Sequence, residues 1–256
     1  MQKETISITF GDQAINHNGM EKIGELATSG LNLTDCTQIL KEKNIDYELI
    51  KLHKYLPDNV SSKGLKAYLV IIRNGVNIML NDIDGASKML EEQKKQKFDK
   101  TALMRGRVVN KKARWNSCYS NIDQEPDIKN GKGTIVAFNH VPILDKLRNI
   151  LPNYFGFKTN NLLAEMNYYY NVNNCGIGFH GDSERKKVIC ARLGETMPMH
   201  FQWFHRFKPV GKRIKLSFNH GDIYIMSEKA VGTDWKKSSL YTLRHAAGCE
   251  KYTTVN

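Results

Sequence analysis

The sequence predicts an α+β protein, in which a small N-terminal α+β unit precedes an antiparallel β-sandwich or barrel. Beyond residue 160, short β-type runs follow one another with turn residues between them, as in sandwiches and barrels. No strand–helix alternation of a doubly wound sheet and no Gly-rich phosphate loop interrupts them. Hydrophobic residues make up 41% and charged residues 25% of the 256 positions, so the chain can bury a full apolar core.

The first 97 residues predict a unit that ends in a connecting helix. Thr34 is placed to cap a first helix. Residues 86–97 are strong helix formers with a thin apolar stripe, which suits a connector. We therefore expect a domain boundary near residue 98, with a small α+β extension at 1–97 and a second domain at 98–256.

A β-hairpin is predicted between these two helices. The segments 67–73 and 76–80 are rich in β-forming residues, and they flank the dipeptide Asn74-Gly75. Because Asn-Gly readily adopts the positive φ angles of a tight turn, the two segments are expected to pair.

The second domain is predicted to contain an amphipathic helix and a series of strands. Pro142 can start the helix and Pro152 can stop it, and the apolar residues between them share one face that we expect to pack on a sheet. Strands are expected at residues 162–170, 187–193, 199–207, 214–218, 222–226 and 240–246. One of the turns between them is expected at Val210-Gly211.

The chain carries a formal net charge of +12, from 38 Lys and Arg against 26 Asp and Glu. A positive field of this size attracts polyanions and steers them on encounter, so DNA or RNA is the natural candidate partner. Lysine-rich proteins can also be basic without binding nucleic acid, and charge alone leaves the partner open.

Cysteine usage and hydropathy predict an intracellular protein without a membrane span. The five cysteines are scattered, and none stands in a Cys-x-x-Cys pair, which indicates reduced thiols rather than disulfides or a zinc ribbon. No apolar run reaches the roughly 18–20 residues of a membrane helix, and no signal-type stretch follows the first residues.

His180 and Asp182 form the motif with the clearest chemical meaning. They follow an aromatic segment and lie two residues apart, so that on a strand their side chains point to the same face. With a distant histidine they can form a two-histidine, one-carboxylate triad that leaves three coordination positions of iron(II) open. The same spacing also suits a solvated turn pair, or a hydrogen-bonded pair in a β protein without a metal.

Several other segments stand in a characteristic order around this pair. A strand with Asn167 and Tyr169 precedes it, and Glu184 follows two positions after the carboxylate. A strand ending in Leu193-Gly194, the aromatic segment 201–204 and a His-Gly-Asp turn at 220–222 come next. In these segments residues 100–256 resemble the AlkB family of nucleic-acid dioxygenases.

The resemblance implies a double-stranded β-helix (jelly-roll) core with flanking helices. It also implies an iron(II)- and 2-oxoglutarate-dependent dioxygenase that dealkylates or hydroxylates a modified or alkylated base in DNA or RNA. Asn167 and Tyr169 would then bind 2-oxoglutarate, with Tyr170 taking the place of Tyr169 if the register slips by one residue. His180 and Asp182 would be two of the iron ligands.

The third iron ligand has four candidates. His245, followed by small residues, resembles the distal histidine of the family. His200 and His205 are an odd number of residues apart on one predicted strand, so their side chains point to opposite faces and cannot both face inward. His220 matches the turn that opens the next strand, although an alignment that takes it as the ligand is an alternative. We expect His245 to complete the triad.

The residue that anchors the distal carboxylate of 2-oxoglutarate is the least determined part of the site. The family places two arginines well downstream of the distal histidine, and the first of them pairs with this carboxylate. The sequence ends at Asn256 without matching them. Lys251 and Arg244 are the expected anchors, with Arg192 as a further candidate. If His220 were the ligand, Lys237 and Arg244 would serve.

Substrate contacts are expected from Glu184 and from the basic segment with Lys112, Arg114 and Trp115. A base that leaves its stack is held by aromatic rings, while basic residues hold the phosphates. A second basic stretch lies at 206–215. Two alternatives stay open: an oxygenase of the same fold that acts on a protein or a small molecule, and a non-catalytic nucleic-acid-binding β-sandwich with a degenerate metal site.

Overall fold

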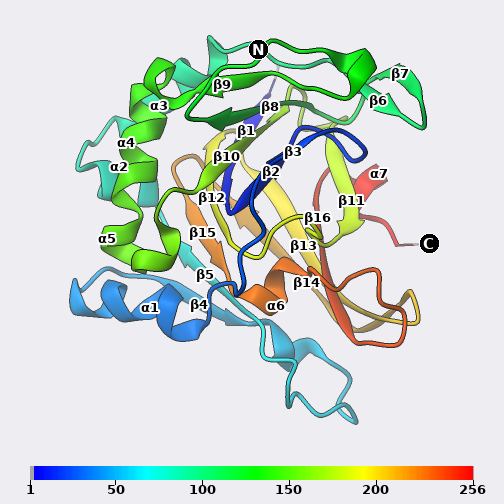
Figure 1. Ribbon diagram of the computed structural model, residues 1–256. Coiled ribbons are helices and arrows are strands. Elements are labelled where there is room, and N and C mark those ends of the chain that lie inside the picture. Colours follow the sequence, from blue (N-terminus) through cyan, green and yellow to red (C-terminus); the bar gives the residue numbers. More distant parts are fainter. Residues whose placement is uncertain (1–2, 256) are drawn as a thin grey trace.

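The largest element of the computed structural model, which describes residues 3–255, is an eight-stranded sheet (Figure 1). In order across the sheet, its strands are β4 (Glu48–Lys51), β5 (Tyr68–Ile72), β15 (Ile223–Met226), β12 (Val188–Gly194), β1 (Thr5–Gly11), β10 (Leu163–Tyr169), β8 (Trp115–Ser120) and β9 (Ile135–Ala137). Neighbouring strands are antiparallel except for the parallel pair β8 and β9.

A second, four-stranded antiparallel sheet packs against the first. Its strands are β11 (Gly176–His180), β16 (Thr242–Gly248), β13 (Met197–His205) and β14 (Lys208–Phe218). Phe201 and Trp203 of β13 share one hydrophobic core with Cys190 and Tyr224 of the large sheet. The predicted α+β class with large antiparallel sheets is confirmed, and the arrangement is compatible with a β-sandwich.

Helices cover the other face of the large sheet (Figure 1). They are α1 (Leu33–Glu42), α2 (Gly75–Leu80), α3 (Gly85–Lys94), α4 (Pro142–Ile150) and α5 (Pro152–Phe155). Two further short helices are α6 (Glu228–Val231) and α7 (Glu250–Thr253), and 3-10 turns lie at Leu52–Tyr55, Ile128–Asn130, Phe138–His140 and Phe157–Thr159. Two small two-stranded sheets pair β2 (Gln13–Ile15) with β3 (Lys22–Gly24) and β6 (Thr101–Met104) with β7 (Arg107–Asn110). Within residues 3–255, no helix combines the length and apolar character required to span a bilayer.

Strand β1 separates an apolar layer from a polar one by simple alternation. Ile6, Ile8 and Phe10 are fully buried in the core beneath the helices. Ser7 and Thr9 point to the opposite face, where they line a cavity between the sheets. Because side chains alternate along a strand, this one segment supplies both a wall of the core and a wall of the cavity.

The large sheet takes strands from both sides of the predicted boundary near residue 98. Strand β1 is hydrogen-bonded between β12 and β10, and β5 is paired with β15. Residues 1–97 were expected to form an extension, but β1, β4 and β5 share one sheet with strands of the segment 98–256. The N-terminal residues therefore help to build the cavity between the sheets.

The predicted hairpin at 67–80 is wrong. Strand β5 pairs with β4 and β15, and the segment after Asn74 forms helix α2. Asn74 does adopt a positive φ of 53°, but it precedes a helix whose residues Val76, Met79 and Leu80 pack into the apolar core. Their spacing of three and four residues places them on one face of a helix. Burial of that face in the apolar core outweighed the β-forming residues and the Asn-Gly dipeptide that had predicted a hairpin.

Two local predictions need smaller corrections. Helix α1 is capped by Asn32 rather than Thr34: the Asn32 side chain accepts from the Asp35 amide at 2.9 Å, and Asp35 accepts from the Asn32 amide at 2.8 Å. Strand β14 begins at Lys208 and runs through Gly211. The turn before it therefore lies at Arg206-Phe207 instead of Val210-Gly211.

Candidate metal centre

Two neighbouring strands of the small sheet bring the predicted triad together. His180 ends β11 and lies directly opposite His245 on β16, and Asp182 follows just beyond the end of β11. The Asp182 Oδ1 atom is 3.4 Å from His180 Nε2 and 3.5 Å from His245 Nε2. One ligand atom from each residue lies within 4.8 Å of the other two, which is compatible with two histidines and a carboxylate around one metal ion.

Hydrogen bonding orients the His180 ring for metal binding. Its Nδ1 atom lies 2.8 Å from the Gly178 carbonyl oxygen, and a carbonyl oxygen can only accept, so Nδ1 carries the proton. The Nε2 lone pair is therefore free and faces Asp182. A carbonyl that fixes the second ring nitrogen in this way is usual for histidine ligands of metals.

Burial and charge set protonation states that suit a metal. Burial opposes ionisation of Asp182, but the adjacent His180 and His245 rings and the charge of Arg185 hold the pKa of this carboxyl well below its usual range. Burial, followed by the proximity of His180, lowers the pKa of His245. An anionic carboxylate beside a neutral imidazole is the pair of states that a metal ion requires.

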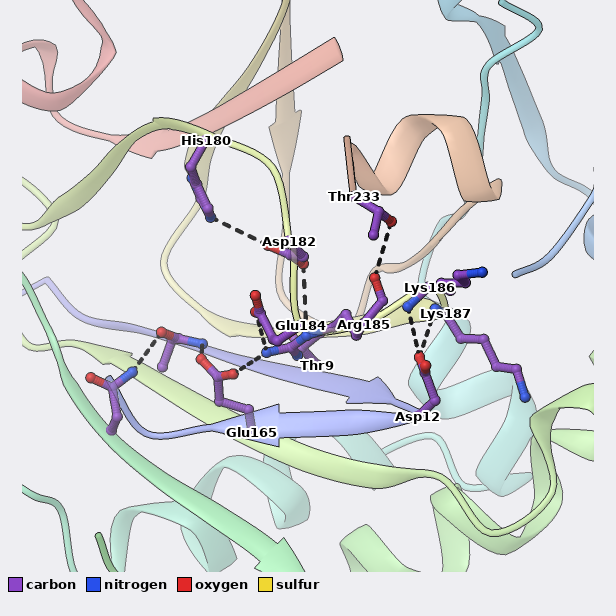
Figure 2. Close-up of polar contacts among 12 residues, drawn as sticks. Thr9, Asp12, Glu165, His180, Asp182, Glu184, Arg185, Lys186, Lys187 and Thr233 are labelled. Carbon is purple, nitrogen blue, oxygen red and sulfur yellow. Dashed lines mark hydrogen bonds and ion pairs between the residues drawn. The ribbon is translucent and has the colours of Figure 1, made fainter. Parts of the chain in front are cut away.

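An acidic network surrounds the base of the triad (Figure 2). The buried Arg185 guanidinium contacts Glu165 and donates to Glu184 Oε1 at 3.0 Å, and its Nε lies 3.9 Å from Asp182 Oδ2. Burial, together with the charge of Asp182, raises the pKa of Glu184. When all three carboxylates are ionised, one guanidinium leaves an excess of two negative charges, which a divalent cation would balance.

Three backbone segments meet too closely for side chains at the turn that carries Asp182. A Cβ atom on Gly181 would lie 2.1 Å from the Gly232 carbonyl oxygen. Gly232 itself has a φ of +76°, and its Cβ would lie 2.4 Å from the Leu243 carbonyl oxygen. The Asp182 amide donates to the Val231 carbonyl at 3.0 Å. Glycine at 181 and 232 therefore lets the Asp182 turn approach β16, where His245 lies.

We expect Gly181→Ala to destabilise the fold by about 1–3 kcal/mol, because the added methyl group must displace backbone rather than a flexible side chain. Urea unfolding of the metal-free protein measures this. Gly178→Ala is the matched control three residues earlier, on β11, since its Cβ would find its nearest atom 3.8 Å away. Equal stability of the two variants would contradict the close packing described here.

The triad opens into a cavity of about 460 Å³ between the two sheets. Besides the triad, side chains on the polar face of the large sheet line it: Ser7, Thr9, Glu165, Asn167, Tyr169, Arg192 and Tyr224. The predicted cosubstrate ligands Asn167 and Tyr169 are thus in the same cavity as the triad. Tyr170, the alternative to Tyr169, points away from it and stacks on Trp115 with ring centroids 4.3 Å apart.

Asn167 is held by three side chains. Its Oδ1 accepts from Arg114 Nε at 2.5 Å and from Asn116 Nδ2 at 2.7 Å, and its Nδ2 donates to Glu165 Oε1 at 2.9 Å. This network leaves one amide N–H of Asn167 for a ligand. The buried Tyr169 adds a hydroxyl to the same wall.

Arg192 is a buried cation in the wall of this cavity. Its side chain comes from β12, the residue is 2% exposed, and Nη1 donates to Ser7 Oγ at 2.6 Å. The Nε atom has no partner, and no carboxylate within residues 3–255 forms an ion pair with this guanidinium. A buried charge without a counterion is costly unless an anionic ligand supplies one.

The expected anchors Arg244 and Lys251 lie elsewhere. Arg244 is adjacent to His245 on β16, so its side chain points to the opposite face of the small sheet. With Lys251 it lines a separate shallow cavity beside Phe204 and Phe207. The prediction that these two residues contact 2-oxoglutarate is therefore corrected, because neither lines the cavity of the triad.

The predicted substrate residues divide into two groups. Glu184 and Arg114 line the cavity. Trp115 and Lys112 do not: Trp115 lies in an aromatic cluster with Lys100 Nζ 4.3 Å from its ring centroid, and Lys112 is exposed. A base inside the cavity could therefore meet Glu184 and Arg114 but could not stack on Trp115.

The other candidate histidines have separate environments. His200 lies between the core residues Met199 and Phe201 on β13, so its side chain points to the other face of the small sheet, where it contacts Phe179 and is 8% exposed. His205 stacks on Tyr241 with centroids 4.4 Å apart. His220 Nδ1 accepts from the Gly194 amide at 3.0 Å, and the same side chain also contacts Ser87. Of the four candidates, His245 is the one that the structure brings to His180 and Asp182.

Ser7, Thr9, Glu165 and Arg185 are among the residues that line the site and that the sequence analysis did not identify. The alternation of polar and apolar residues in β1 indicates a half-buried strand. The local sequence does not show which strands β1 pairs with, so it does not show that its polar residues line this cavity. Arg185 stands three positions after Asp182, and its buried ion pairs depend on Glu165 of a distant strand.

Comparison with known proteins gives a family but no activity. No family model matches the chain. The chain is 46% identical over 253 residues to a protein of Acanthamoeba polyphaga mimivirus with the name Uncharacterized protein R156, and the match covers 98% of each chain. Identity of this level over nearly the whole length means that the two proteins share one fold and one family. The chain thus belongs to the family of this mimivirus protein.

Proposed function

We propose that the protein is an iron(II)- and 2-oxoglutarate-dependent dioxygenase with a double-stranded β-helix core, acting on a modified or alkylated base in DNA or RNA. One observation carries the proposal. The His180, Asp182 and His245 triad shares a cavity with the buried and unpaired Arg192. A metal site and an anion site in one cavity fit a dicarboxylate cosubstrate that chelates the metal at one end.

The donor set fits iron(II). Two imidazoles and one carboxylate suit a divalent metal of intermediate softness and leave coordination positions open for other ligands. The excess negative charge around Arg185 favours a dication at this place. His180, Asp182 and His245 would hold the metal, and Gly178 would keep the His180 ring oriented through its carbonyl.

The cavity also fits 2-oxoglutarate. Arg192 can form a charge-assisted pair with the distal carboxylate, and Ser7, which already accepts from Arg192, lies beside it. Tyr169 and the remaining amide hydrogen of Asn167 can donate to the same ligand. With dioxygen as the oxidant, bound iron and 2-oxoglutarate would supply oxidative chemistry that converts the cosubstrate to succinate and carbon dioxide, with one oxygen atom going to succinate and the other to a hydroxylated substrate C–H bond.

The protein's own part is to position and shield the reactants. Arg185 holds Glu165 and Glu184 in the wall beside Asp182, so that neither carboxylate turns toward the metal ligands without breaking an ion pair. Tyr224 lines the cavity and belongs to the apolar core that also contains Phe201, and this core would limit access of bulk water from that side. Glu184 is placed to accept from a substrate N–H group.

Nucleic acid is the substrate class that the charge favours. The net charge of +12 would attract a phosphate backbone. Lys22, Arg114 and Lys236 line the same cavity as the triad and can meet phosphates around a base that enters it. A hydroxylated N-methyl group would be lost as formaldehyde, which is the dealkylation expected from the resemblance.

An anaerobic titration tests this proposal. Iron(II) and 2-oxoglutarate added to the intact protein should produce a weak visible metal-to-ligand charge-transfer band, which neither compound should give alone. Succinate formation should then be stimulated by methylated oligonucleotides. Absence of the band would refute the oxygenase assignment, and stimulation by peptides alone would refute the nucleic-acid substrate.

A further inference from the structure

The outer face of the small sheet carries a second cavity next to the one that holds the triad. It is lined by Gly178, Phe179, Phe204, Phe207, Arg244, Lys251, Tyr252, Thr254 and Val255. Gly178 and Phe179 also line the cavity of the triad. The two cavities are therefore neighbours across β11, so an extended ligand can occupy both.

Arg244 in this second cavity resembles Arg192 in the first. The residue is 8% exposed, its Nη2 donates to the Trp235 carbonyl at 3.2 Å, and its Nε has no partner. No carboxylate of the described chain forms an ion pair with it, and burial lowers the pKa of its guanidinium. The guanidinium instead lies 4.2 Å from the Phe204 ring centroid. A nearly buried cation without a carboxylate partner favours an anionic ligand.

The small sheet carries cations and no carboxylates on its strands. Four of its five Lys and Arg residues are on β14, the fifth is Arg244 on β16, and the four strands contain no Asp or Glu. Lys251, which lines the cavity, and Arg206, which precedes Phe207, are both exposed. This surface can therefore hold a phosphate at several points, with no carboxylate on the strands to repel it.

Phe207 adds an aromatic surface in an unusual conformation. It lies at the tip of the hairpin between β13 and β14, where it is 57% exposed and has a φ of 62°. A residue with a bulky side chain rarely adopts this left-handed backbone conformation. Because the Phe207 ring is largely exposed, packing in the core does not compensate for that conformation. An exposed ring beside cations is the arrangement on which unpaired bases stack.

We propose that this second cavity binds a nucleotide of a single-stranded nucleic acid, adjacent in the strand to the nucleotide whose base enters the metal cavity. Phe207 stacks on the base, and Arg244 and Lys251 hold the neighbouring phosphate. The proposal rests on the proposed function. It assigns the expected cosubstrate anchors Arg244 and Lys251 to substrate binding instead.

The test measures fluorescence anisotropy of a labelled single-stranded oligonucleotide of about twelve nucleotides with the full chain, without iron or 2-oxoglutarate. Phe207→Asn should weaken binding about 5- to 150-fold, because it removes one stacked base. Asparagine tolerates the left-handed backbone, so this variant should fold at least as well as the original protein. Lys251→Gln should reduce the slope of log affinity against log salt by about 0.7.

Lys41→Gln is the matched control, because this exposed lysine lies on α1, on the far side of the large sheet. It should leave both affinity and slope unchanged. Unchanged binding by either Phe207→Asn or Lys251→Gln would overturn the proposal. Equal competition by a polyglutamate peptide of matched charge would also overturn it, in favour of an acidic protein partner. Because no metal is present, this assay and the charge-transfer titration can fail independently.

Discussion

Replacing Asp182 by alanine should abolish tight binding of a divalent metal. Asp182 would supply the anionic ligand between two imidazoles, and its Oδ1 is within 3.5 Å of both Nε2 atoms. Loss of a residue that only hydrogen-bonds to a metal ligand already lowers metal affinity about 10–100-fold. Loss of the ligand itself should therefore lower it more than about 100-fold. Anaerobic competition between the protein and a chelator of known affinity for iron(II) measures the change.

Stability gives a second measurement that needs no activity. A metal at about 100 times its Kd should stabilise the folded protein by about 2.7 kcal/mol, and the Asp182→Ala variant should show no such effect. His245→Ala should behave in the same way. His200→Ala is the control, because this histidine lies on the neighbouring strand and faces outward. The triad assignment fails if Asp182→Ala and His245→Ala keep the original metal affinity as His200→Ala does.

Part of the site could be predicted from the sequence because it is local. The spacing of His180 and Asp182 implies a shared orientation wherever the strand lies, and His245 follows from the order of the surrounding segments. Asp182 in fact lies just beyond the end of β11. The glycine at 181 and the close approach of Gly232 place it beside His245, and such backbone packing has no signature in the sequence.

Arg192 was one of the candidate anchors, but the sequence could not select it because its place in the cavity depends on pairing between distant strands. Arg192 lies opposite Ser7 on β1, and Ser7 lies opposite Asn167 on β10. These three residues form one row across the sheet, but their pairing joins segments more than 150 positions apart. Arg244 could have been excluded from the sequence alone, since it is adjacent to His245 on a strand and must face the other way.

The hairpin at 67–80 shows the limit of local signals in the same way. Asn74-Gly75 provided the positive φ that a turn needs, and the structure uses that conformation. The chain then continues as a helix because the large sheet already has β4 and β15 as partners for β5. Asn74-Gly75 correctly predicted the end of the strand. Packing of the following residues into the apolar core then determined that they form helix α2 rather than a second strand.

The variant Arg192→Met should show whether Arg192 binds a ligand or stabilises the fold. The variant removes a buried charge that has no carboxylate partner in the described chain, so the free energy of unfolding of the ligand-free protein should stay the same or increase. Binding of 2-oxoglutarate should weaken by about 2–5 kcal/mol, or roughly 30-fold or more. Isothermal titration with the metal-loaded protein measures the binding, and urea unfolding measures the stability.

Arg185→Met is the matched comparison, since Arg185 is 3% exposed, lines the same cavity and is paired with carboxylates. Its loss leaves buried carboxylates unpaired and should destabilise the fold by about 3–5 kcal/mol. Pyruvate, a 2-oxo acid without the distal carboxylate, distinguishes the roles further. The original protein should prefer 2-oxoglutarate, and Arg192→Met should bind both acids about equally. If the preference survives, another residue anchors the distal carboxylate, whereas a destabilised Arg192→Met variant would make Arg192 part of the scaffold.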